Sequence, residues 1–217
     1  MAEKNQHILS NAREWVIAKL GEDSSGHDAW HTFRVANTAL RIALEEGADS
    51  YICELAALLH DMADEKLVPD VAEAEAEMIR WMHNEGVDSD AVDHVMEIIR
   101  TMSFKGGNRP AVRTLEGRVV QDADRLDAIG AIGIARVFAY TGWKGSPLHD
   151  PNLTPRDEMT PEEYRNGKDT AINHFYEKLL RLKALMNTNY GLQLAGERHA
   201  FMEQYLEQFY EEWEGKR

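Results

Sequence analysis

Three ionisable residues, His60, Asp61 and Asp64, follow an apolar run and have the side chains that bind metal ions or transfer protons. If residues 54–66 form a helix, these side chains fall within an arc of roughly 100° on one face. The opposite face carries the apolar residues Leu55, Leu58, Leu59 and Met62. A solvated face is the simplest interpretation, but small apolar residues precede the ionisable ones on the same side: Cys53, Ala56 and Ala57. Because buried charges are costly unless they are paired or bound to a cation, the pattern favours a metal site or active site.

Two more segments supply candidate ligands. His31 shares a helical face with apolar residues, which on its own is more typical of a structural core histidine than of a ligand. On a helix predicted over 116–140, Asp122 lies about 200° from Asp124, so only one of them can face the centre. We favour Asp124, because the alanines on its face permit close approach of another helix.

Three segments in this order resemble the signature of the HD superfamily of metal-dependent phosphohydrolases. They are His31-Thr32-Phe33-Arg34-Val35, Leu58-Leu59-His60-Asp61 and Asp122-Ala123-Asp124-Arg125-Leu126-Asp127. Three further segments resemble the bacterial YedJ/YpgQ-like branch: 26–28, 130–136 and 174–180. The resemblance covers nearly the whole chain, and the ordered set is far more specific than one His-Asp pair.

The resemblance implies a divalent metal held by His31, His60, Asp61 and Asp124, with Asp64 as the catalytic residue beside a metal-bound water. Two imidazoles and two carboxylates suit Mn²⁺, which we expect, and are compatible with Mg²⁺, Co²⁺, Ni²⁺, Fe²⁺ or Zn²⁺. Family members with more than one metal typically carry an adjacent histidine pair. This sequence has isolated histidines instead, so a single metal is favoured, with a second kept open by His94.

The resemblance also implies an activity. It is the hydrolysis of nucleoside triphosphates or deoxynucleoside triphosphates by a metal-activated water, giving the monophosphate and pyrophosphate. One alternative keeps the metal site in a nucleotidase or cyclic-nucleotide phosphodiesterase, and the other is a non-enzymatic helical regulatory protein with a structural metal. We predict that the substrate contacts His27, Lys66, Lys105, Arg125, Asp127 and Lys178.

Helical periods run along the 217 residues without a sustained period of two, so we predict an all-α fold. The resemblance implies one HD domain, a compact multi-helix bundle with C-terminal capping helices. We expect a metal-binding helical core over about 1–140, and a long loop with capping helices over about 141–217. Among the predicted helices are 49–64, 116–140, 169–187 and 192–213. The irregular segment 141–159 has the length of a functional or mobile loop.

Composition and net charge argue against a protein that binds duplex nucleic acid, crosses a membrane or contains an intrachain disulfide. A net charge of −14 argues against a duplex nucleic acid partner, but a bound cation can still attract a small phosphorylated substrate such as a nucleotide. The sequence lacks a signal-peptide pattern and a long apolar run, so we expect a cytoplasmic protein without a membrane partner. Cys53 is the only cysteine, which excludes an intrachain disulfide. The sequence leaves a homodimer open.

Overall fold

The computed structural model describes residues 2–21, 28–65, 67–102, 112–156 and 169–217. Helices dominate these ranges and no β-strand occurs in them, so the predicted all-α class is confirmed. None of the helices in the described ranges has both the length and the apolar character needed to cross a membrane. The residues form two compact units, Met1–Asp124 and Arg125–Arg217. The predicted division of roles at about residue 140 stays a prediction.

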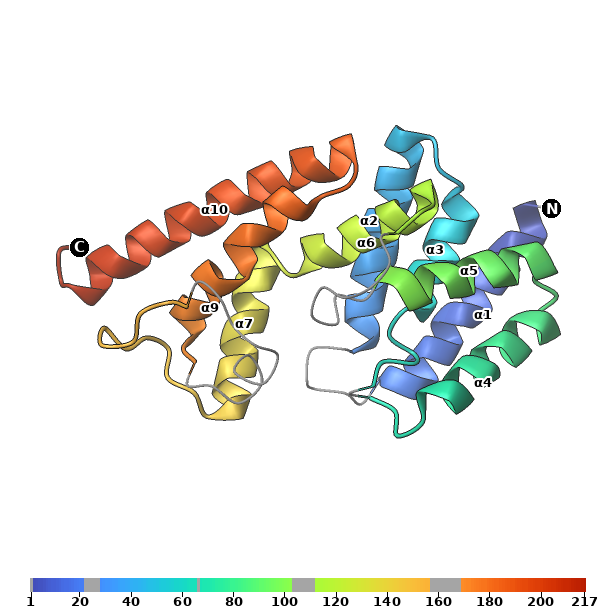
Figure 1. Ribbon diagram of the computed structural model, residues 1–217, viewed down its shortest axis with the longest axis horizontal. Coiled ribbons are helices and arrows are strands. Elements are labelled where there is room, and N and C mark those ends of the chain that lie inside the picture. Colours follow the sequence, from blue (N-terminus) through green and yellow to red (C-terminus); the bar gives the residue numbers. More distant parts are fainter. Residues whose placement is uncertain (1, 22–27, 66, 103–111, 157–168) are drawn as a thin grey trace. The chain divides into compact units, whose positions relative to one another are not determined.

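The first unit is built around α3 (Ser50–Leu59), which packs against three neighbouring helices (Figure 1). Those neighbours are α1 (Ala2–Leu20), α2 (Ala29–Glu46) and α5 (Ser89–Met102). The unit also contains α4 (Val71–Asn84) and most of α6 (Leu115–Asp127). Every residue of α3 from Leu55 to Leu59 is buried. Because each buried Leu stabilises the fold by about 1.5–3 kcal/mol, α3 is the core of this unit.

Capping residues fix where two helices of the first unit begin. Asp28 lies before α2, and its Oδ1 accepts a hydrogen bond from the backbone N–H of His31 at 2.8 Å. Asp49 does the same for α3, accepting from the N–H groups of Tyr51 and Ile52. Such caps contribute about 0.5–2 kcal/mol each and set the helical register. The cap at Asp28 therefore also sets the direction in which the His31 side chain leaves α2.

The helix that we predicted over 49–64 ends earlier, at Leu59. His60 occupies the C-cap position, and turns follow in which Met62 N–H donates to Leu59 O at 3.1 Å and Asp64 N–H donates to Asp61 O at 3.1 Å. These bonds span three residues instead of four, so the chain leaves the α-helical path. His60, Asp61 and Asp64 thus lie in a turn at the end of α3 and do not share one face of a continuous helix.

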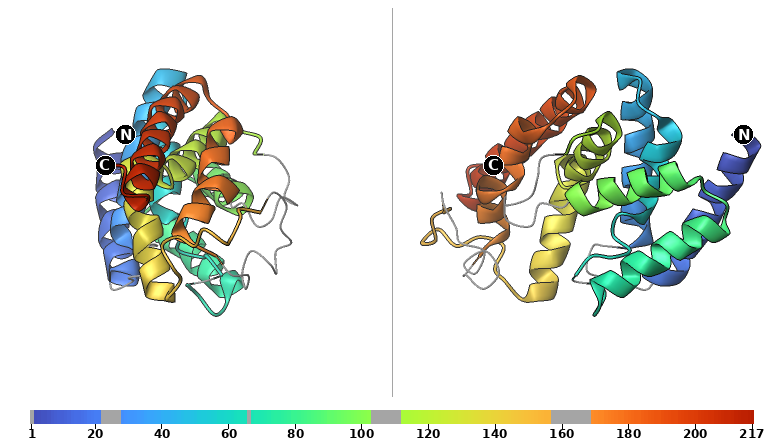
Figure 2. Two further views of the ribbon diagram at one scale, coloured as in Figure 1. Left: turned by 90° about the vertical axis from the view of Figure 1, so that its left-hand side faces the viewer. Right: turned by 45° about the vertical axis from the view of Figure 1, so that its right-hand side comes forward.

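The second unit contains α7 (Gly130–Lys144), α9 (Ala171–Glu177), the 3₁₀ helix η2 (Leu179–Leu185) and α10 (Asn189–Trp213). The long α10 packs against α7 and η2, and α9 packs against the same two elements (Figure 2). The helix predicted over 116–140 is therefore two helices, α6 and α7. The helix predicted over 169–187 is α9 followed by η2.

Residues 145–156 belong to the segment that we predicted as a functional or mobile loop, but they are tied to α9. Pro147 O and Leu148 O accept hydrogen bonds from backbone N–H groups of α9, at 3.3 and 3.1 Å. Leu153 O accepts one from the Asn173 side chain at 3.0 Å, and Arg156 forms an ion pair with Glu177 at 2.8 Å. This part of the predicted loop is a firmly attached structural element.

Candidate metal centre

The first unit brings together a histidine of α2, a histidine at the end of α3 and an aspartate of α6. His31 Nε2 lies 3.4 Å from Asp124 Oδ1, and His60 Nε2 lies 3.8 Å from the same oxygen. One ligand atom from each of these three residues lies within 4.8 Å of the others, and within the described ranges no other group of three or more such residues comes so close. That separation is suited to one metal ion bound between them.

Asp61 lies against both imidazole rings. Its Oδ2 is 3.5 Å from His31 Nε2 and its Oδ1 is 3.3 Å from His60 Nε2. The Asp61 carboxyl group and the His31 ring are buried, whereas the Asp124 side chain is 38% exposed, so the site is enclosed on one side and open to water at Asp124. Asp61 is not part of the group of three ligand atoms within 4.8 Å, but its oxygens face the same two nitrogens.

The hydrogen bonding of His60 tests whether the site fits a metal ion. Its Nδ1 lies 2.7 Å from the backbone carbonyl oxygen of Ala57, and since that oxygen can only accept, Nδ1 carries the proton. The buried Nε2 has no hydrogen-bond partner. In a neutral ring its lone pair faces the oxygens of Asp61 and Asp124, which is unfavourable unless a cation lies between them. The donor atoms therefore fit a divalent metal.

The pKa of Asp124 also indicates a site that can bind a divalent metal ion. Burial opposes ionisation of this carboxyl group, but a hydrogen bond from His31 and the positive charge that the His60 and His31 rings carry when they are protonated outweigh it. The pKa of Asp124 is therefore below its ordinary value, and the group is a carboxylate at neutral pH. The ionised Asp124 and the carboxyl group of Asp61 face two ring nitrogens, a set of oxygen and nitrogen donors of the kind that binds a divalent cation.

Three acidic or histidine residues near the proposed ligands were left open by the sequence as alternative or additional members of the metal centre. Asp122 is completely buried and lies outside the group of three ligand atoms, which contains Asp124; the role of Asp124 as a ligand stays a prediction. Asp64 is half-buried and follows Asp61 in the same turn. His94 Nε2 lies 3.6 Å from Glu116 Oε2, outside the group. The described ranges thus contain one candidate metal centre, and a second one at His94 gains no support.

The residues predicted to contact the substrate are found in different settings. Asp127 is buried and forms an ion pair with Arg136, whereas the Arg125 guanidinium donates to Leu185 O. Lys178 occupies the C-cap position of α9. The remaining three lie outside the described residues: His27, Lys66 and Lys105. The substrate-binding role of all six stays a prediction.

Sequence reasoning missed two features that shape the centre. The Ala57 carbonyl that orients His60 cannot be found from the sequence, because every residue carries one. The cap at Asp28 does have a signal, an aspartate three residues before His31, which is the usual spacing for a side chain that caps the third residue of a helix.

Comparison with known proteins places this centre in a family. Residues 29–129 match the family model described as HD domain. YpgQ of Bacillus subtilis is 43% identical over 198 residues, which cover 90% of this chain and 89% of that protein. An HD-superfamily hydrolase from Bacillus thuringiensis has a similar structure, with 42% identity, a TM-score of 0.79 and coverage of 97% and 99% of the two chains.

A further similar structure is that of B. subtilis YpgQ in complex with ADP. It has 40% identity and a TM-score of 0.78, and the match covers 95% of this chain and 98% of that one. The matched HD region contains His31, His60 and Asp124, the three residues that the fold brings together. The chain therefore belongs to the HD superfamily, within its YpgQ-like family, and is a metal-dependent phosphohydrolase.

Proposed function

We propose that the protein is a nucleoside triphosphate pyrophosphohydrolase that cleaves between the α- and β-phosphates of NTPs or dNTPs. The main support is the buried His60 Nε2, which has no hydrogen-bond partner and faces two carboxylates beside His31. The ADP bound to B. subtilis YpgQ, a relative at 40% identity, supports a nucleotide as the substrate class. The cleavage position rests on the resemblance to the YedJ/YpgQ-like branch.

We assign the metal to His31, His60, Asp61 and Asp124. The two imidazoles supply nitrogen donors, and the two carboxylates balance the charge of a divalent cation. This mixed set suits Mn²⁺, our proposed metal. A divalent cation held here supplies acidification of a water molecule and polarisation of a phosphoryl oxygen.

The remaining steps are assigned to protein side chains. Asp64 is half-buried in the turn that also carries Asp61, and we give it the transfer of the proton from the attacking water. The hydrogen bond from His60 Nδ1 to Ala57 O holds the imidazole in one orientation. Lys178 and Arg125 are the described cations that we assign to the phosphates.

A nucleotide panel tests the proposal. The protein is prepared without chelator and incubated with NTPs, dNTPs, NMPs and cyclic nucleotides in the presence of Mn²⁺, Mg²⁺ or Co²⁺. Equal amounts of nucleoside monophosphate and pyrophosphate are expected, and His60→Ala should remove the activity. Orthophosphate without pyrophosphate would show a nucleotidase, and turnover of cyclic nucleotides alone would show a phosphodiesterase.

The regulatory alternative requires its own measurement. If the protein has a structural metal and no catalysis, elemental analysis will find the metal, but turnover of every nucleotide will equal that of Asp64→Ala. Product release that is sensitive to Asp64→Ala, in a variant that retains its metal, would exclude this alternative.

A further inference from the structure

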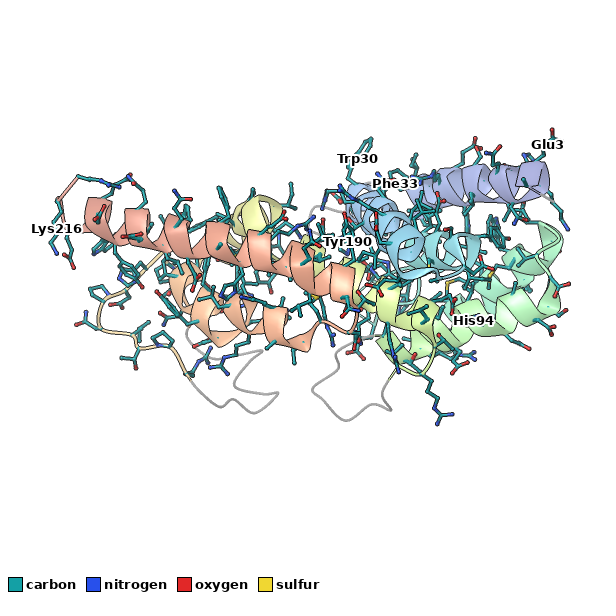
Figure 3. The ribbon with its side chains drawn as sticks, turned by 90° about the horizontal axis from the view of Figure 1, so that it is seen from above. Glu3, Trp30, Phe33, His94, Tyr190 and Lys216 are labelled. Atoms are coloured by element: carbon teal, nitrogen blue, oxygen red, sulfur yellow. The ribbon has the colours of Figure 1, made fainter. Side chains whose placement is uncertain are left out.

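Glu116 lies in the first turn of α6 and contacts both α3 and α5. Its Oε1 accepts a hydrogen bond from the backbone N–H of Asp49, the N-cap of α3, at 3.1 Å. Its Oε2 lies 3.6 Å from Nε2 of His94, which projects from α5 (Figure 3). The Glu116 side chain is only 17% exposed, so solvent screens its contacts less than those of a surface pair. One side chain therefore connects the starts of α3 and α6 to each other and to α5.

The main chain of Glu116 is also joined to α3. The Cys53 Sγ, in the first turn of α3, lies 3.9 Å from the backbone carbonyl oxygen of Glu116. Burial raises the pKa of the Cys53 thiol, and the nearby carboxylates of Glu116 and Asp49 raise it further. The thiol therefore keeps its proton and donates a weak hydrogen bond to that oxygen. The side chain and the main chain of one residue thus hold the start of α6 against the start of α3.

The two helices joined at Glu116 carry three of the four proposed ligands at their opposite ends. His60 and Asp61 follow α3, and Asp124 lies in the last turn of α6. There His60 Nε2 is 3.8 Å from Asp124 Oδ1, so the two helices meet at both ends. In the described ranges, the backbone of α3 approaches those of α1, α2 and α5 more closely than that of α6. The placement of α6 relative to α3 therefore depends on individual side-chain contacts.

We propose that Glu116 is a positioning residue of the metal centre, which sets the separation between the ligands of α3 and Asp124 of α6. This inference rests on the metal assignment proposed above. Asp124 follows Glu116 by eight residues, about 12 Å along α6, so a displacement of the start of α6 is carried to the ligand. The reach of the side chain to the Asp49 N–H decides this role. Its charge does not, because an amide oxygen accepts from the same N–H, and an attraction between Glu116 and the metal over that distance is largely screened by salt.

Mn²⁺ binding by three Glu116 variants of the full chain tests the proposal. Glu116→Asp keeps the charge but shortens the side chain, and it should weaken Mn²⁺ binding by about tenfold, as should Glu116→Ala. Glu116→Gln keeps the length without the charge, and its Kd should stay within about twofold of that of the unmodified protein. Electron paramagnetic resonance of free Mn²⁺ gives the Kd values. Losses in Glu116→Gln and Glu116→Ala but not in Glu116→Asp would show an effect of charge and would overturn the proposal.

Glu54→Ala is the matched control. The Glu54 side chain is 15% exposed and pairs with Arg13 at 2.8 Å, which joins α3 to α1. Both substitutions therefore remove a partly buried carboxylate that attaches α3 to a neighbour, but only Glu116 attaches it to the helix of Asp124. Glu54→Ala should bind Mn²⁺ within about twofold of the unmodified protein. Equal losses in Glu54→Ala and Glu116→Ala would indicate a general loosening of α3 and would contradict a positioning role.

NMR signals of the His31 and His60 ring nitrogens, recorded without metal, separate this inference from the proposed function. Both rings face Asp124 Oδ1, so Glu116→Asp and Glu116→Ala should shift their signals. Glu116→Gln and Glu54→Ala should leave them in place. If the unmodified protein does not bind Mn²⁺, the metal assignment is wrong, and the ring signals still decide whether Glu116 positions these side chains. Unchanged signals in Glu116→Asp would overturn the proposal, even if Glu116→Ala fails to fold.

Discussion

His31 Nε2 and Asp124 Oδ1 lie 3.4 Å apart, although α3, α4 and α5 lie between α2 and α6 in the chain. A hydrogen bond from His31 helps to keep the pKa of Asp124 below its ordinary value, against the effect of burial. The pair thus joins two distant segments at the candidate metal centre. The metal-binding role that we propose for this pair can be separated experimentally from the proton-transfer role that we propose for Asp64.

The first prediction concerns the division between ligands and the proton-transfer residue. His60→Ala and Asp61→Ala should each lose the metal and turnover, because each removes a donor from the centre. Asp64→Ala should retain the metal while turnover falls by about 10² to 10⁴, the usual contribution of a positioned acid or base. Elemental analysis and nucleotide turnover are measured on the same preparations.

A ligand-dependent melting experiment supplies the control for these variants. Added Mn²⁺ should raise the Tm of the unmodified protein and of Asp64→Ala, because an ion that binds the folded state stabilises it. It should not raise the Tm of His60→Ala. Equal loss of metal in all three variants would contradict the assigned roles.

The second prediction concerns the ion pair between Arg156 and Glu177. The Glu177 side chain is only 2% exposed, and its two oxygens accept hydrogen bonds from Arg156 Nε and Nη2 at 2.8 Å. Glu177→Gln should lower the free energy of unfolding by about 2–4 kcal/mol, since it leaves a partly buried guanidinium without its counter-charge. Chemical denaturation measures this change.

An exposed ion pair provides the comparison. Glu73 and Arg80 pair at 2.7 Å on the surface of α4. Glu73→Gln should change the free energy of unfolding by about 0.5 kcal/mol or less, because solvent screens exposed pairs. Similar losses for the two substitutions would show that the tie between residues 145–156 and α9 does not depend on Glu177.

The third prediction concerns the pH dependence of stability. Burial and the nearby charge of Lys178 lower the pKa of His174 to about 4, from an ordinary value of 6.5. Between these two pH values the unfolded chain binds a proton that the folded chain does not, so stability falls as the pH decreases from 6.5 to 4. Stability is therefore greatest above pH 6.5, and the loss amounts to about 3 kcal/mol once the pH has fallen to the folded-state pKa and below.

Unfolding curves at pH 7, 6, 5 and 4.5 measure this dependence. His174→Gln should reduce the loss of stability over this range relative to the unmodified protein. The same substitution at the exposed His7 of α1 serves as the control and should leave the dependence unchanged. If His174→Gln and the unmodified protein lose stability in parallel, His174 is not responsible.

The fourth prediction concerns the bend between α6 and α7. A Cβ atom at Gly133 would lie 2.2 Å from the backbone oxygen of Ala128, so Gly133→Ala requires a shift of backbone. It should lower the free energy of unfolding by about 2–4 kcal/mol. Gly196→Ala on α10, where a Cβ meets nothing within 4 Å, should raise it by about 0.5–1 kcal/mol. Denaturant midpoints of the two variants should therefore move in opposite directions.

The all-α class could be predicted from the sequence, because apolar residues recur with the helical period. The helical face led to the preference for Asp124 over Asp122, whereas His31, which alone is typical of a core histidine, was selected through the resemblance to the HD superfamily. The bend before α7 could not be predicted, since Gly130 and Gly133 are also compatible with one small-residue helix. At the bend the backbone of Gly130 is left-handed, with φ of 74°, and Gly133 approaches the carbonyl of Ala128 five residues earlier, local features that helical periodicity does not reveal.

The end of α3 was the other feature that periodicity could not reveal. Met62 continues the apolar spacing and is buried, as a residue of a longer helix would be. The backbone nevertheless turns at His60, because bonds of the type Met62 N–H to Leu59 O replace those of the α-helix. The spacing of apolar residues predicts which residues are buried. It does not determine where a helix ends, because a turn can bury the same residues as a longer helix.

The turn at the end of α3 has a consequence for metal affinity. His60 and Asp61 are joined by one peptide bond, and their Nε2 and Oδ1 atoms are 3.3 Å apart. Under the proposed assignment, an ion bound by one of these side chains would hold the other near it at a high effective concentration, as in a bidentate chelator. Its dissociation would require both donors to release it before either rebinds, so the assignment implies slow exchange of the ion.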